Sequence, residues 1–333
     1  MFPEIASLVL AVLVINFLIQ LPFLFVCTRI IESSPPFGVQ LADPVEGDER
    51  FRIPTTGGLE LAGCLLPPSS GQPRGLVVFC PETGGNQWMA LNYCGSLLEA
   101  GFAVLSFDFR NQGASDSLPG YEPLHWMTRY EMDDLGSVLR YVESRADLAG
   151  LPVGLFGVSR GGATALAVSV NEPQIRWIVT ESAFCTQMIQ HWFARHWAKL
   201  FVPDWLLRLV PDWHVRWTVD LARGMTAWRR GLRYPVLRRL LPRLAGRPVL
   251  MISGKRDSYV KPDIARQMQQ CAGEGCELWL VPKARHNDAR TIDQDAYDRR
   301  VTGFVDVAMG TDVGAEPSVC PKSRATGQPQ SVG

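Results

Sequence analysis

The 333-residue sequence lacks the marks of several protein classes. None of its eight cysteines forms a Cys-x-x-Cys pair, and its five histidines do not cluster at the spacing of metal ligands. Thiols scattered over so long a chain argue against a disulfide framework and favour reduced, mostly buried cysteines in a cytosol-facing domain. We therefore expect neither a metal site nor a disulfide-stabilised secreted fold.

Net charge and internal repeats are also absent. Lys+Arg and Asp+Glu balance at 33 residues each, so the overall charge indicates no nucleic-acid partner, and none is expected. Nothing in the sequence indicates an oligomeric state. With 47% apolar residues, the chain is long enough for one large domain with a full core and an insertion.

The longest apolar run lies at the N-terminus. Residues 5–27 carry no charge, and about 20 apolar residues are enough to cross a bilayer core. A signal peptide would have basic residues before the run and a small-residue cleavage site after it, and neither is present. We expect residues 1–29 to be a single transmembrane anchor, with a buried core helix as the alternative. Arg29 favours a cytoplasmic position for the rest of the chain.

Between the two ends, strand-like and helix-like patterns alternate. Residues 30–49 are polar and Pro-rich and predict a linker, whereas residues 307–333 predict a disordered tail. Residues 50–182 and 248–306 should form the core, with short apolar strands at 59–66, 76–80, 103–107, 153–156, 178–180, 249–253 and 278–281, and helices at 89–100, 130–144, 162–170 and 261–271. This alternation predicts an α/β fold with a mostly parallel sheet, whose earliest strands pair antiparallel at one edge.

One region interrupts the alternation. Residues 183–247 show helical patterns without a strand, and residues 184–247 hold eleven arginines and one lysine against three aspartates. We expect a helical cap over the carboxyl edge of the sheet. Its six tryptophans are best explained as the core of the cap, with the arginines on its exposed face. Contact with a membrane interface is the alternative.

The sharpest motif is Gly-Val-Ser-Arg-Gly-Gly at residues 157–162. It follows an apolar strand and precedes a helix, which is the context of a nucleophile elbow. The flanking glycines permit a sharp turn that lifts Ser159 to a helix N-terminus, where developing negative charge is favoured. A serine that merely caps the helix is the plainer alternative.

A serine nucleophile needs a base and an orienting acid, which in this arrangement follow it in the order acid, then histidine. Asp257 follows the apolar strand at 249–253, and His286 follows the strand at 278–281. Glu181 is an alternative acid. The other histidines fit the base less well because they precede the nucleophile or lie in the cap, and they are His125, His191, His196 and His214.

The oxyanion hole needs two N–H donors. We assign them to the backbone of Arg160 and of Thr83, the latter in a loop of small residues after the strand at 76–80, with Glu82 as the alternative. A carboxylate pointing into that hole would oppose the oxyanion. We therefore expect Glu82 to point away or to select the substrate.

These motifs together resemble the α/β-hydrolase superfamily over about residues 50–306. The segment Asp-Phe-Arg-Asn-Gln-Gly-Ala-Ser at 108–115 resembles that family's D-x-R-G-x-G-x-S turn, with Asn111 in place of the first glycine. The Arg-Gly-Gly after Ser159 is similar to the dienelactone hydrolase, acyl-CoA thioesterase and serine aminopeptidase-like branches. The resemblance implies a Ser159–His286–Asp257 triad.

We expect a membrane-anchored serine hydrolase that cleaves an ester with a small-molecule or lipid-like acyl group. Thioester, acyl-protein or peptide hydrolysis is the alternative within the same chemistry. An inactive fold that serves as a membrane-binding module is the alternative from another class. The chemistry requires no metal or organic cofactor.

Overall fold

The computed structural model describes residues 2–33, 39, 41–45, 47–199 and 202–310, and its centre is one eight-stranded sheet. The order across the sheet is β1-β2-β4-β3-β5-β6-β7-β8. In chain order the strands are β1 (Glu49–Pro54), β2 (Glu60–Leu66), β3 (Gly75–Cys80), β4 (Phe102–Phe107), β5 (Val153–Val158), β6 (Ile175–Glu181), β7 (Val249–Gly254) and β8 (Cys276–Val281).

The pairing confirms the predicted mostly parallel sheet. The strands from β4 through β3 and β5 to β8 run parallel, whereas β2 pairs antiparallel with both β1 and β4 at one edge. Strand β3 is buried at every position because helices cover both of its faces. The sequence patterns missed β1, which is mostly exposed and has only one buried side chain.

Helices cover both faces of the sheet and create two apolar cores. On one side α3 (Arg129–Ser144), α4 (Arg160–Ser169) and α9 (Pro262–Ala272) pack on the sheet. On the other side lie α2 (Ala90–Glu99) and α11 (Gln294–Ala308). The short helices η1 (Gln87–Met89) and α10 (Ala289–Ile292) belong to the loops around them.

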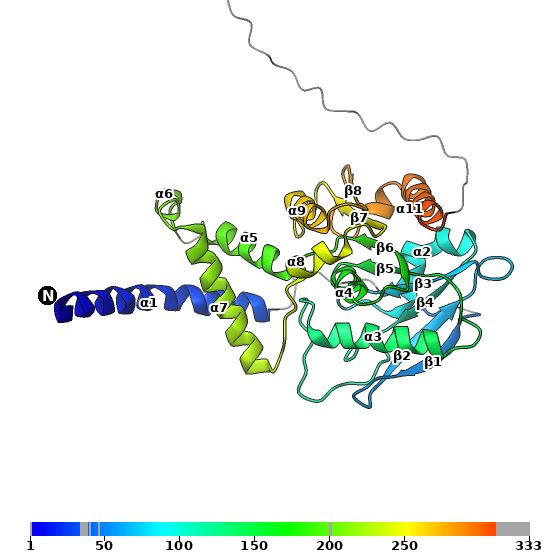
Figure 1. Cartoon of the computed structure of the whole chain (residues 1–333), viewed down its shortest axis with the longest axis horizontal. Coiled ribbons are helices and arrows are strands. Elements are labelled where there is room, and N and C mark those ends of the chain that lie inside the picture. The colour runs from blue at the N-terminus through cyan, green and yellow to red at the C-terminus, as the bar shows by residue number, and fades with distance from the viewer. Residues whose placement is uncertain (1, 34–38, 40, 46, 200–201, 311–333) are drawn as a thin grey trace, which may run out of the picture.

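The segment predicted as a cap is helical, and its described residues contain no strand. It comprises α5 (Thr186–Ala198), α6 (Asp204–Leu207), α7 (Asp212–Arg230), α8 (Leu237–Leu240) and η2 (Leu241–Leu244). Helices α5–α7 extend away from the sheet on the same side as α1 (Figure 1). The interpretation of the tryptophans as the cap core is wrong for five of them, because Trp197, Trp205, Trp213, Trp217 and Trp228 are exposed.

Helix α1 (Phe2–Glu32) contains the predicted anchor. Its stretch Val14–Glu32 is long and apolar enough to cross a membrane, a property that signal sequences and core helices share. The helix continues to Glu32, three residues beyond the expected end of the anchor at residue 29. Much of the predicted linker (34–38, 40 and 46) and most of the predicted tail (311–333, with Cys320) lie outside the described residues.

The end of α1 is attached to the rest of the protein. The indole nitrogen of Trp126 donates a 2.8 Å hydrogen bond to the carbonyl oxygen of Ile31. Farther toward the N-terminus, the amide nitrogen of Gln20 lies 2.5 Å from Nε2 of His214 on α7. Helix α1 therefore crosses α7 and packs against it (Figure 1) instead of projecting freely from its last turn.

The turn after β4 explains why asparagine can replace a glycine at position 111. Asn111 has a φ of 60°, a left-handed conformation that asparagine tolerates better than most residues. Its side chain accepts a hydrogen bond from the Leu118 N–H and donates one to the Tyr121 carbonyl. Gly113 remains necessary, because a Cβ atom there would lie 2.1 Å from Oδ2 of Asp108.

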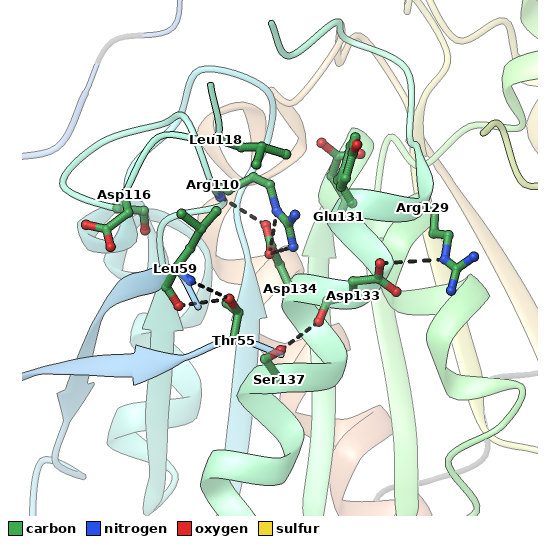
Figure 2. Close-up of polar contacts among 12 residues, drawn as sticks. Thr55, Leu59, Arg110, Asp116, Leu118, Arg129, Glu131, Asp133, Asp134 and Ser137 are labelled. Atoms are coloured by element: carbon green, nitrogen blue, oxygen red, sulfur yellow. Dashed lines mark hydrogen bonds and ion pairs between the residues drawn. The ribbon is translucent and has the colours of Figure 1, made fainter. Parts of the chain in front are cut away.

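The same turn is tied to α3 by a buried ion pair. Arg110 donates from Nε and Nη2 to Oδ1 of Asp134 at 2.9 and 2.6 Å, and its backbone N–H donates to Oδ2 (Figure 2). Both side chains are buried. The adjacent residue Asp133 forms a 3.6 Å pair with Arg129, one turn earlier on α3, and both partners are exposed (Figure 2).

These two aspartates give a matched test of stability. Asp134→Ala leaves the guanidinium of Arg110 buried and unpaired, so the free energy of unfolding should fall by about 3–5 kcal/mol. Asp133→Ala breaks only an exposed pair and should cost less than about 1 kcal/mol. Urea denaturation followed by tryptophan fluorescence measures both, and equal losses for the two variants would contradict the assignment of the buried pair.

Candidate active site

Ser159 lies at a sharp turn between β5 and α4. Its backbone has φ 53° and ψ −116°, a combination that a non-glycine residue adopts only under strain. The Ser159 N–H donates a 2.8 Å hydrogen bond to the carbonyl of Glu181 at the end of β6, which holds the turn against the sheet. This is the strand–turn–helix geometry predicted from residues 157–162.

The flanking glycines are required by close backbone packing. A Cβ atom on Gly161 would lie 2.1 Å from the carbonyl oxygen of Cys80, at the end of β3. A Cβ atom on Gly157 would lie 2.6 Å from the carbonyl oxygen of Gly161. Because both neighbours are backbone atoms that cannot rotate away, a side chain at either position would force the backbone to shift.

The structure brings the three predicted triad residues together. Oγ of Ser159 lies 3.1 Å from Nε2 of His286, and Nδ1 of His286 lies 2.8 Å from Oδ2 of Asp257. Asp257 follows β7 and His286 follows β8, so both reach the edge of the sheet at which β5 ends in Ser159. The other oxygen of Asp257 accepts hydrogen bonds from the Tyr259 and Val260 N–H groups at 2.7 and 2.8 Å, which fix its orientation.

The alternative acid has other partners. The buried carboxyl group of Glu181 accepts a 2.6 Å hydrogen bond from the hydroxyl of Tyr297 and a 2.9 Å bond from the Ala289 N–H. Burial, the largest cause, raises the pKa of Glu181 from 4.5 to about 7, and the nearby charge of Glu82 adds to this. Glu181 therefore supports the loop that carries His286, whereas Asp257 contacts its ring.

The remaining histidines bond or stack elsewhere. His191 lies 2.8 Å from Asp220, His214 contacts Gln20, His125 stacks on Trp126, and His196 stacks on Trp192.

Glu82 turns toward α2 and the His286 loop. Its carboxylate accepts hydrogen bonds from the side-chain amide of Asn287 and, at 3.3 Å, from the hydroxyl of Tyr93. Burial raises its pKa, while the bond from Asn287 and the charge of His286 act in the opposite direction. The sequence left open whether Glu82 points away from the oxyanion hole or selects the substrate. Hydrogen bonds from Asn287 and Tyr93 hold the carboxylate in the direction observed.

The assignment of the oxyanion hole to the backbone N–H groups of Arg160 and Thr83 remains a prediction. Arg160 is the first residue of α4, where a helix leaves its N–H groups without partners inside the helix. Thr83 is half-buried in the loop after β3, in the turn closed by the Gly85 N–H on the Glu82 carbonyl. The side chain of Arg160 is wholly buried and donates to the Leu124 carbonyl at 2.8 Å.

Sequence comparison gives a partial family match and two informative relatives. Residues 71–230, which include Ser159 but neither Asp257 nor His286, match the family described as serine aminopeptidase, S33. An uncharacterized protein of Mycobacterium tuberculosis is 25% identical over 241 residues, covering 72% of this chain and 73% of that protein. The mitochondrial acyl-coenzyme A thioesterase 2 of Mus musculus is 30% identical over 159 residues, covering 45% of this chain and 32% of the thioesterase.

Structural comparison matches a larger share of the chain than the family model does. An esterase of Pyrococcus furiosus superposes with a TM-score of 0.61 at 20% identity, covering 83% of this chain and 97% of the esterase. The chain has the α/β-hydrolase fold. A second α/β hydrolase, from Penicillium, superposes with a TM-score of 0.58 at 18% identity, covering 79% of this chain and 99% of that one.

A cavity of about 800 Å³ opens beside the imidazole of His286. Glu82, Tyr93, His286 and Asn287 line it, together with the half-buried Arg290 and the exposed Arg285. Bidentate bonds from Arg290 to Asp298 leave Arg285 as the freer of the two cations. A group bound in this cavity would meet both a buried carboxyl group and a guanidinium.

Several residues around the site were not found from the sequence. Tyr297 bonds Glu181, Asn287 bonds Glu82, and the ring of Tyr259 packs edge-on against the His286 ring at 5.2 Å between centroids. Tyr297 begins an i, i+4, i+8 apolar series with Val301 and Val305, which could have revealed α11. Nothing local distinguishes Asn287 or Tyr259.

The raised pKa of Glu181 predicts how the stability of the hydrolase changes with pH. Between pH 4.5 and about 7 the folded protein binds a proton that the unfolded chain releases, so the free energy of unfolding falls as pH rises through this window. The fall attributable to Glu181 should reach roughly 3 kcal/mol. Glu181→Gln should flatten this fall, as measured by urea midpoints at pH 5 and pH 8.

Glu274→Gln is the control, because Glu274 is exposed and its substitution should leave the pH dependence unchanged. A fall that is as steep in Glu181→Gln as in the native chain would assign the effect to another group.

Proposed function

We propose that this α/β hydrolase is a serine hydrolase that cleaves a carboxylic ester through an acyl-enzyme. The observation that carries the proposal is the continuous contact from the Ser159 hydroxyl through the two imidazole nitrogens of His286 to Asp257, at 3.1 and 2.8 Å. These distances lie within the range over which a base can take the proton of a serine.

In the proposed reaction, His286 takes the Ser159 proton through Nε2 while Oγ attacks the ester carbonyl carbon. Asp257 keeps the proton of His286 on Nδ1 and stabilises the imidazolium that forms. The backbone N–H groups of Arg160 and Thr83 are assigned to the oxyanion. His286 then protonates the leaving alcohol, and water, deprotonated by the same imidazole, hydrolyses the acyl-enzyme.

A thioester is the second candidate substrate, supported by the similarity to the mouse acyl-coenzyme A thioesterase over 45% of the chain. The same triad serves both leaving groups, because the attacked carbonyl and the oxyanion are alike. Turnover of p-nitrophenyl esters and acyl-CoA thioesters of rising chain length separates the two. A higher kcat/KM for thioesters at every chain length would replace the ester proposal.

We also propose that the hydrolase is attached to a membrane through α1 as a single-pass anchor. The length and composition of Val14–Glu32 support this attachment. Arg29 at the end of the apolar run favours a cytoplasmic position for the hydrolase domain. The proposed substrate is accordingly a small or lipid-like acyl ester that is present on the cytoplasmic side of the membrane.

Ser159→Ala tests the nucleophile. The variant should lose all labelling by a fluorophosphonate probe, and kcat should fall by a factor on the order of 10⁶. Ser253→Ala is the matched control, because Ser253 is also buried, at the end of β7, and its hydroxyl has no hydrogen-bond partner among the described residues. Labelling that survives in Ser159→Ala, or disappears in Ser253→Ala, would contradict the proposed role of Ser159.

Glu82→Gln tests substrate selection by the carboxyl group beside the imidazole. Removing its negative charge should lower KM for an ester with an anionic leaving group by roughly threefold to tenfold at pH 8, where the carboxylate repels such a group most. The KM of a neutral ester should change much less. Glu99→Gln, which alters an exposed carboxylate at the end of α2, is the control. Equal changes for both esters in Glu82→Gln would remove the selecting role.

A further inference from the structure

One face of α1 is buried against the protein along half of the helix. Gln20, Leu24, Thr28 and Ile31 are buried, and only 3% of Gln20 is exposed. Their spacing of four, four and three residues places them on one side of the helix. The other sides carry exposed apolar residues, including Phe17, Leu21 and Phe25. Helix α1 is therefore both a packed element of the protein and an apolar surface.

Helix α1 is too short to cross a bilayer using only the residues that do not contact the rest of the protein. Some of the residues packed against the protein must therefore lie within the membrane. A bilayer core of about 30 Å needs about 20 residues at 1.5 Å each, so a span that starts at Ile5 ends near Leu24. The residues before Asn16 cover only about half of that thickness. Gln20 and Asn16, which contact His214, would then lie about 6 and 12 Å inside the apolar core.

The polar groups of α1 indicate that this contact persists in lipid. Asn16 and Gln20 interrupt an otherwise apolar run, and unpaired amides are costly in hydrocarbon. Here the Gln20 amide donates to the side-chain oxygen of Asn16 at 3.0 Å, and both amides lie within reach of Nε2 of His214. Separation of α1 from α7 would keep the bond between the two amides but would remove the contact of both with His214.

The residues next to His214 have the chemistry of a membrane interface. Trp205, Leu209 and Trp213 are 65%, 70% and 67% exposed, which is unusual for residues that would otherwise face water. Tryptophan concentrates at the boundary between headgroups and hydrocarbon. These residues lie in α6, in the loop after it and at the start of α7, which, like α1, extend away from the sheet on one side (Figure 1).

The charges of this region suit an anionic surface. Asp212 pairs with Arg195 at 2.6 Å, and Asp204 lies 3.9 Å from Lys199, so each nearby acid has a basic partner. Arg208 and Arg216 are exposed and have no ion pair among the described residues. Basic side chains of this kind reach toward anionic headgroups while their stems stay in the apolar layer.

We propose that residues 203–217, comprising α6 and the start of α7, are immersed together with α1 in the near leaflet of an anionic bilayer. The membrane-embedded unit is then a layer of three helices that contains part of the predicted cap, and the hydrolase rests directly on the lipid. The inference rests on the membrane attachment proposed above and is independent of the catalytic chemistry.

Photolabelling of the full chain tests the inference. The protein is reconstituted into vesicles of phosphatidylglycerol and phosphatidylcholine that contain a phospholipid with a diazirine in its acyl chain, and labelled peptides are mapped by mass spectrometry. Peptides from residues 203–217 should carry at least about tenfold more label than α11, whose exposed Val307 is the control for apolar side chains facing water.

The outcomes separate this inference from the proposed attachment. Label on α1 with only the α11 level on residues 203–217 overturns the inference and leaves the anchor intact. If α1 also carries only as much label as α11, the proposed membrane attachment itself is overturned.

A pair of variants tests the same surface without disturbing the core. The double substitution Trp213→Glu and Trp217→Glu changes two exposed residues and should lower the label on residues 203–217 severalfold while α1 stays labelled. Trp228→Glu is the matched control, because Trp228 is also exposed but lies at the far end of α7. Labelling that is unchanged by the double substitution would contradict the proposed immersion.

Discussion

The close approach of α4 to the ends of β3 and β5 is the constraint on which the site depends. With Gly161 against the Cys80 carbonyl, the chain can pass from β5 into α4 only through a strained residue, and Ser159 takes that conformation. The hydrogen bond from its N–H to the carbonyl oxygen of Glu181 holds this strained conformation against the sheet. Oγ is thereby fixed at the edge where the loops after β7 and β8 bring Asp257 and His286.

Much of this arrangement could be predicted because it depends on local sequence. Seven of the eight strands follow from short apolar runs, since a strand buried on both faces needs apolar residues throughout. The triad follows from the positions of Ser159, Asp257 and His286 directly after strands whose carboxyl ends meet at one edge. Even Asn111, where the resembling segment has a glycine, agrees with the pattern, because asparagine tolerates the left-handed conformation observed there.

The features that could not be predicted depend on partners distant in the sequence. Whether Glu82 points into the oxyanion site or away from it is decided by Asn287 and Tyr93. The tryptophans of residues 183–247 looked like the core of a cap because their exposure depends on how α6 and α7 lie beside α1. The polar residues of α1 have a clear purpose only once His214, almost 200 residues later, is placed next to them.

The attachment of α1 has a mechanical consequence for the imidazole. The indole of Trp126, bonded to the last turn of α1, packs on Phe184, which packs on Tyr259, which meets the ring of His286. Membrane helices tilt when their apolar length and the bilayer thickness disagree. Under the proposed membrane attachment, a tilt of α1 would act on the first ring of this series, so lipid chain length would be a variable to control whenever turnover is measured. Deleting α1 would remove one end of the series.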